Sequence, residues 1–161
     1  MPSTSAAVAP ASGFELIARA VAVVSLTDLA LVHVIDLPGT LDETPLIGAG
    51  YFVLIAAALV TGVLLMARSN WMAWAATGLV AAGAMGAYIL TRTVPGFLGD
   101  HEDVGNWRCS LGLAALSLET VLIALAAVQA TRRPASVPVP VQVPEPLPAS
   151  PNSHRTYTHV L

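Results

Sequence analysis

The chain contains no lysine, a single cysteine and few charged residues of any kind. All seven basic residues among its 161 are arginines, and Asp, Glu, Lys and Arg together make up 11% of the sequence. The sequence therefore lacks the basic patch that nucleic-acid-binding proteins use. Cys109 has no second cysteine with which to form an internal disulfide or a paired-thiol redox centre. A Gly-x-Ser-x-Gly elbow, a His-Glu-x-x-His helix and a phosphate-binding glycine loop are also absent, which argues against several enzyme classes.

Hydrophobic residues are abundant instead. They make up 55% of the chain, above the roughly 45–50% of soluble domains. They gather in four segments, which span residues 14–35, 45–67, 71–90 and 110–129. Each segment has about the 20 residues that a helix needs to cross roughly 30 Å of hydrocarbon. The sequence predicts an all-α membrane protein with four transmembrane helices.

The connections between these segments predict topology and orientation. The short turn Arg68–Asn70 makes the second and third helices antiparallel neighbours, so we expect an up-down-up-down bundle. Residues 1–13 carry no basic residue, which argues for a true first span after a disordered N-terminus rather than for a signal peptide. Arg68 and Arg132-Arg133 mark the cytoplasmic side. Both termini are then cytoplasmic, the chain lies in the plasma (inner) membrane, and the loops 36–44 and 91–107 face outward.

The composition changes after Arg133. Seven of the twelve prolines lie between Pro134 and Pro151. Proline fixes φ and removes a hydrogen-bond donor, so residues 134–161 are predicted to form a disordered, Pro-rich tail.

Ionisable residues inside the predicted spans are the candidates for function, because burying a charge must be compensated. Asp28 lies on one polar arc of the first helix with Ser25, His33 and Asp36, and we expect this arc to face the bundle interior. Glu119 lies at a comparable depth on the fourth helix.

Glu119 lies on one stripe of the fourth helix with Arg108, Gly112 and Ala115. The small residues Gly112 and Ala115 let a neighbouring helix approach, which favours an inward orientation of Glu119. At the outer end of the third helix, Tyr88 and Arg92 share a face.

These residues predict an outward-facing polar pocket below the charged loop 91–107. Its candidate ligand-binding residues are Asp28, His33, Tyr51, Tyr88, Arg92, Trp107 and Glu119. We expect Asp28 and Glu119 to be energetically coupled, because two nearby carboxylates in a low dielectric do not both ionise cheaply. A purely structural alternative is that Asp28 and Glu119 are buried, share a proton or pair with Arg92 or Arg108, and only fix the helix register.

The sequence identifies no metal or cofactor. His33, His101 and Glu119 are the candidates for a metal ligand set. A bis-histidine haem within one subunit is disfavoured because only His33 lies in a span.

Several motifs resemble those of a family of small four-helix bacterial membrane proteins, largely actinobacterial, with no established activity. They are LVHVIDLPGTLDETPLIGAGYF, then YILTRTVPGF, and a Trp followed by LGLAALSLE. The resemblance covers roughly residues 14–130 and implies that His33, Arg92, Trp107 and Glu119 form one outer-half constellation. The insertion GDHED, which contains His101, departs from shorter members.

Two functional hypotheses follow. The first is a non-enzymatic membrane protein whose pocket binds a small ligand, cation or lipid headgroup, or which serves a larger membrane complex or homo-oligomer as an accessory subunit. The second is a small membrane enzyme or proton-coupled carrier that uses Asp28 and Glu119 as a titrating pair.

Overall fold

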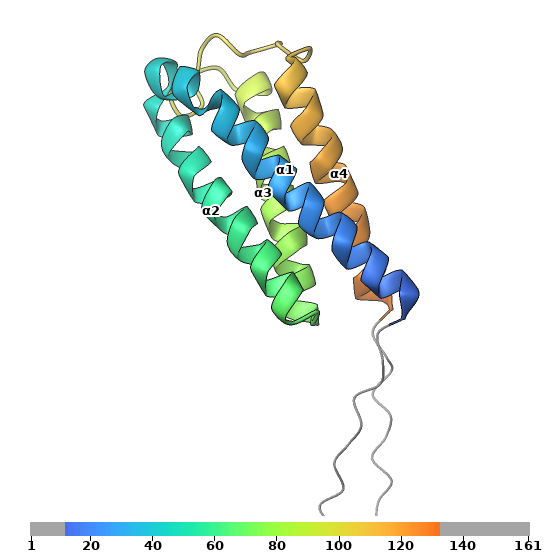
Figure 1. Cartoon of the computed structure of the whole chain (residues 1–161). Helices are drawn as coiled ribbons and strands as arrows, with labels where there is room; N and C mark the ends of the chain where they lie inside the picture. The colour runs from blue at the N-terminus through green and yellow to red at the C-terminus, as the bar shows by residue number, and fades with distance from the viewer. Residues whose placement is uncertain (1–11, 133–161) are drawn as a thin grey trace, which may run out of the picture.

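The computed structural model describes residues 12–132 as a bundle of four helices. They are α1 (Gly13–Glu43), α2 (Pro45–Ala67), α3 (Trp71–Thr93) and α4 (Ser110–Thr131). Each helix is long and apolar enough to cross a membrane, as the sequence predicted. In Figure 1 the chain ascends in α1 and α3 and descends in α2 and α4. The predictions for residues 1–11 and 134–161 lie outside the described residues.

Local sequence signals mark the starts of α1, α2 and α3. Ser12 caps α1 by accepting a hydrogen bond from the Glu15 backbone N–H (3.3 Å), and Asn70 caps α3 by accepting one from Ala73 (2.9 Å). Pro45 begins α2, where a proline fits because the first helical N–H needs no partner within the helix. The predicted starts of α2, α3 and α4 agree with the structure, and α1 begins one residue earlier than predicted.

The prediction of a loop over residues 36–44 is wrong, because α1 continues to Glu43 through Pro38. Thr40 Oγ1 donates to the Asp36 carbonyl oxygen (3.1 Å) and steadies the backbone beyond the proline. Leu41 lies against Gly48 of α2, where an added Cβ would approach Leu41 Cδ2 to 2.6 Å. This packing between two helices maintains the helix where Pro38 and Gly39 locally favour a turn.

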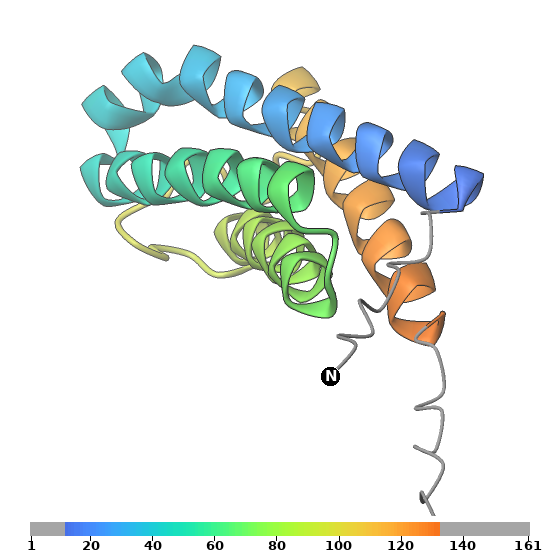
Figure 2. The ribbon, with the colours of Figure 1, turned by 60° about the horizontal axis from the view of Figure 1, so that its bottom comes forward.

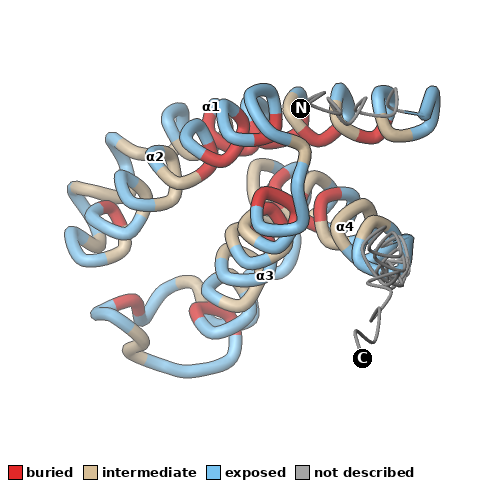
Figure 3. Tube along the Cα trace, turned by 90° about the horizontal axis from the view of Figure 1, so that it is seen from below, coloured by how far each residue is buried: buried red, intermediate tan, exposed pale blue. Residues whose placement is uncertain are grey.

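The bundle packs through α1 against α2 and α4, and through α3 against α2 and α4 (Figure 2). Its most deeply buried large side chains include Leu26, Leu29, Leu65 and Leu122. Large hydrophobic side chains also cover the outside of every helix, Val53 and Leu79 among them. In Figure 3 the buried residues follow the inner sides of the helices, while exposed residues follow the outer sides. An apolar exterior of this kind fits contact with a lipid bilayer.

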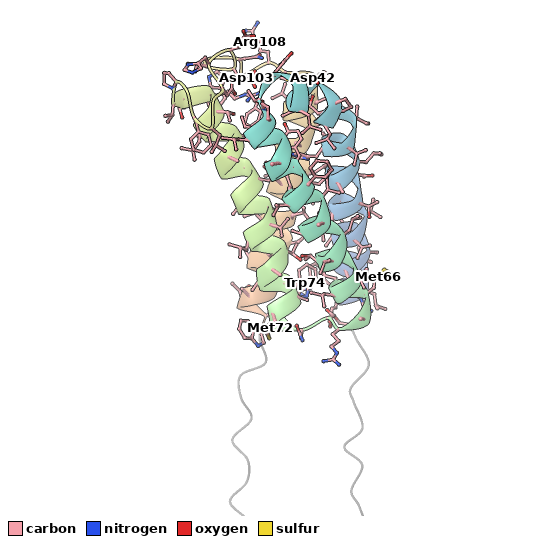
Figure 4. All side chains as sticks on the ribbon, turned by 90° about the vertical axis from the view of Figure 1, so that its left-hand side faces the viewer. Asp42, Met66, Met72, Trp74, Asp103 and Arg108 are labelled. Carbon is pink, nitrogen blue, oxygen red and sulfur yellow. The ribbon has the colours of Figure 1, made fainter. Side chains whose placement is uncertain are left out.

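The two ends of the bundle differ in character (Figure 4). We name the end that carries Asp42, Asp103 and Arg108 the outer end, and the end that carries Met66, Met72 and Trp74 the inner end, after the predicted orientation. At the inner end the Arg132 guanidinium lies 3.8 Å from the centroid of the Phe14 ring. This contact sets the first turn of α1 level with the last turn of α4.

Candidate functional site

Arg92 holds the loop after α3 onto the bundle at the outer end. It lies in the last turn of α3, is 9% exposed, and its Nη1 contacts Asp103 Oδ2 at 2.8 Å. Nη1 also donates to Thr91 Oγ1 (2.7 Å), and Nε donates to the Asn106 carbonyl oxygen (3.2 Å). The guanidinium carbon lies 4.3 Å from the centroid of the Tyr88 ring. Arg92 is thus already paired within the chain and acts as a structural hub.

Asp100 binds the backbone of its own loop. Asp100 is 4% exposed, and its Oδ1 accepts from the N–H groups of Glu102 and Asp103, both at 3.1 Å. The Gly96 N–H donates to the Asp100 carbonyl oxygen (2.7 Å), and Gly96 has φ of 76°, which suits glycine. Arg92, Asp100 and Asp103 thus have a structural role in folding this loop.

A second polar cluster joins α1 and α2. Tyr51 donates its hydroxyl hydrogen to Asp36 Oδ2 (3.0 Å), and its ring meets the His33 ring edge-on with centroids 4.6 Å apart. His33 Nδ1 lies 2.8 Å from the Leu29 carbonyl oxygen. Since a carbonyl only accepts, Nδ1 carries the proton and Nε2 is left as the second polar atom of the ring. Arg92 also interacts electrostatically with Tyr51, so the charge of Arg92 acts on this second cluster as well.

Tyr88 packs against α4 at the glycine that the sequence analysis placed above Glu119. A Cβ added at Gly112 would overlap Tyr88 Cε2, so the ring occupies the space left by the missing side chain. The Tyr88 hydroxyl is buried and has no hydrogen-bond partner among the described residues. Trp107 approaches the same ring edge-on at 6.1 Å between centroids, while remaining 45% exposed.

Glu119 is the most deeply buried ionisable residue of the described chain. It is 1% exposed and shares the inner face of α4 with Ala115 and Leu122. Its Oε2 has no hydrogen-bond partner, and no ion pair involves Glu119 within residues 12–132. The predicted inward orientation is confirmed. The expected stripe with Arg108 is wrong, because α4 begins only at Ser110 and Arg108 is exposed in the loop.

Asp28 does not face the interior of the bundle, so this expectation is wrong. It is exposed, whereas its neighbours Leu29 and Ala30 are buried. The small residues Ala18 and Ala22 let the other helices approach α1 closely and so select the face that turns inward. Ser25 lies inside that face and Asp28 lies beyond its edge. Asp28 and Glu119 therefore point into different surroundings and do not form the predicted floor of one pocket.

A hollow that sequence reasoning missed lies at the inner end, opposite the predicted pocket. It measures about 730 Å³ and is lined by apolar residues such as Gly78 and Ile123 and by polar ones that include Glu15 and Arg132. Gln129 also lines it, and its Nε2 is buried without a partner among the described residues. The sequence holds a weak signal for it, because Gly78 and the alanines near Ala126 leave little side-chain volume between α3 and α4.

The candidate metal ligands are not brought together. Within residues 12–132 no group of three or more His, Cys, Asp or Glu side chains is arranged to hold a metal ion. His101 is exposed in the loop beside Gly96, and Glu119 is buried between helices.

The chain matches no protein-family model, no curated protein and no solved structure. The resemblance to a bacterial four-helix family therefore stays an expectation.

Proposed function

We propose that this multi-pass membrane protein reversibly binds a proton or a small cation at Glu119. The observation that carries the proposal is the 1% exposure of Glu119 together with an Oε2 that has no hydrogen-bond partner among the described residues. An ionised carboxylate in such surroundings is costly unless a proton or a cation neutralises it. The arrangement is thus that of a binding group whose partner comes from outside the described chain.

The arginines near the outer end do not neutralise Glu119. Arg92 is held by Asp103, Thr91 and Asn106. Arg108 is exposed in the loop before α4. This arrangement supports an external partner for Glu119 rather than the purely structural pairing that the sequence left open.

Tyr88 extends the proposed site toward the outer end. Gly112, against which its ring packs, lies two helical turns or about 10 Å before Glu119 on the same face of α4. The unpartnered Tyr88 hydroxyl therefore lies on the outer-end side of the carboxyl group. We propose that the ion enters from this end, past Tyr88 and Trp107, with the outer end facing away from the cytoplasm and both termini in the cytoplasm of a plasma-membrane protein.

The carrier or enzyme hypothesis that pairs Asp28 with Glu119 loses its geometric basis, since one carboxyl group is exposed and the other buried. If the protein is a carrier that uses Glu119 alone, proteoliposomes should show a proton or cation flux that disappears in Glu119→Gln. If it is an accessory subunit, Glu119 should bind the ion without any flux.

Infrared difference spectroscopy of the protein in lipid nanodiscs tests the proposal. Between acidic and alkaline buffer we expect a carbonyl band of a protonated carboxylic acid to change in the wild type and to be missing in Glu119→Gln. Asp28→Asn is the matched control and keeps this band. At constant pH, sodium, potassium or magnesium chloride reduces the band if a metal cation displaces the proton, and choline chloride at equal ionic strength does not.

A spectrum without a Glu119-dependent band that responds to pH or to these salts would contradict the proposal. A band that stays constant in every buffer would identify Glu119 as a permanently protonated structural group.

A further inference from the structure

The outward face of α1 carries one carboxyl group in an otherwise apolar row. The exposed residues of this face recur at alternating steps of four and three positions: Ile17, Val21, Val24, Asp28, Leu31 and Ile35. In Figure 3 the exposed side of α1 is turned away from α3 and α4. Two parallel helices that pack with knobs in holes meet along a row with this spacing.

Asp28 lies near the middle of the membrane span. It follows Phe14 by about 21 Å of helix, and Phe14 is level with Arg132 at the inner end. It precedes Asp36 by about 12 Å, and Asp36 is level with Tyr51, itself about 9 Å inside the start of α2. The two registers place Asp28 about 21 Å along the helix from the level of the inner end and about 21 Å from the level of the start of α2, which is midway between them.

At this depth the Asp28 side chain is too short for its carboxyl group to reach water. Long side chains such as arginine reach the membrane surface from below it, whereas aspartate has a single methylene group and does not. A carboxyl group on a lipid-facing surface at this depth lacks hydrogen-bond partners and is costly. A polar partner on another chain removes that cost.

The spacing of the row does not by itself identify an interface. The outer face of α2 shows the same steps and contains no polar residue: Phe52, Ala56, Leu59, Val63 and Met66. Asp28 distinguishes the face of α1 from this lipid-facing surface, because a single polar residue in a helix seam fixes the register and the number of strands.

We propose that this face of α1 is the interface between two copies of the chain, related by a twofold axis along the membrane normal. Two copies with the same orientation place Asp28 opposite Asp28 and apolar residues opposite apolar residues at every level. A protonated carboxyl group has one donor and free acceptors, so each Asp28 donates one hydrogen bond to the other and accepts one. A second copy therefore satisfies both carboxyl groups without a basic partner.

Disulfide cross-linking in lipid nanodiscs tests this interface. In a Cys109→Ser background, single cysteines at Val24 and Leu31 probe the α1 seam, and single cysteines at Leu59 and Val63 serve as matched controls on α2. We expect oxidation to give covalent dimers from the α1 positions and few from the α2 positions. Asp28→Leu in the Val24→Cys protein should lower the dimerisation constant about tenfold, as expected for two interhelical hydrogen bonds.

Asp28→Asn keeps a donor and an acceptor and should retain most of the dimer, which separates loss of hydrogen bonding from loss of folding. Equal cross-linking from α1 and α2, or a dimer unaffected by Asp28→Leu, would overturn the proposal. A third outcome would also overturn it. If the protein stays a monomer and associates, through Asp28, only with a leucine-rich transmembrane peptide carrying a central lysine, then this face binds a basic partner helix.

Discussion

Close contacts hold several side chains in place in the outer half of the bundle. Two buried polar atoms there have no hydrogen-bond partner among the described residues. Arg92, Asp36 and Asp100 each have partners within the chain. Glu119 Oε2 and the Tyr88 hydroxyl are buried and have none among the described residues. The residues that sequence analysis grouped as one pocket thus separate into contacts that stabilise the fold and atoms that are free to bind something else.

We expect that adding a single methyl group at Gly112 destabilises the protein. Gly112→Ala would place a Cβ against Tyr88 Cε2, and relieving this overlap should lower the free energy of unfolding by about 1–3 kcal/mol. Gly86→Ala is the control, because nothing lies within 4 Å of a Cβ there. Reversible unfolding in mixed detergent micelles measures both, and an equally mild effect at the two glycines would contradict the close packing of Tyr88.

Because Asp28 and Glu119 are separated, we expect no energetic coupling between them, contrary to the prediction from the sequence. Because one carboxyl group is exposed and the other buried, Asp28→Asn and Glu119→Gln should have additive effects on the free energy of unfolding, within about 0.5 kcal/mol. The double-mutant cycle is measured at low protein concentration in micelles, where association contributes least. A larger interaction energy would show that the two groups share surroundings after all.

At the scale of the helix, α1 extends past Pro38 because α2 supports it. The Tyr51–Asp36 hydrogen bond and the contact of Leu41 with Gly48 both lie between these helices. A proline removes a backbone hydrogen bond and locally favours a break, so the last turns of α1 depend on these contacts.

Tyr51→Phe should loosen the end of α1. It removes the hydroxyl that donates to Asp36 and should cost about 1 kcal/mol, with faster amide hydrogen exchange over residues 39–43. Tyr88→Phe is the matched control, since the Tyr88 hydroxyl has no partner among residues 12–132, and it should leave both quantities nearly unchanged. Similar exchange rates in the two variants would mean that the hydroxyl bond does not support the extension.

For the whole molecule, the distribution of arginine against the acidic outer loop predicts the orientation in the membrane. The loop 94–109 and the turn Arg68–Asn70 lie at opposite ends of the bundle (Figure 1). Arg68 and Arg132 both lie at the inner end, which the positive-inside tendency assigns to the cytoplasm.

Labelling of intact cells tests this orientation. In a Cys109→Ser background, an impermeant thiol reagent should modify a cysteine at Gly99 and should spare one at Ser69 until the cells are opened. The reverse pattern would place the entrance that we propose beside Tyr88 on the cytoplasmic side.

The sequence by itself determined the number of helices, most of their bounds and the inward orientation of Glu119. These follow from the hydrophobic length of each segment and from the small residues before Glu119, both of which are patterns within a single segment of the sequence. Only the tertiary structure decided that α1 continues through Pro38, that Asp28 faces outward and that Arg92 is already paired. The physical reason is that each of these depends on contacts between segments distant in sequence, and helix periodicity alone does not specify which edge of a polar arc turns inward.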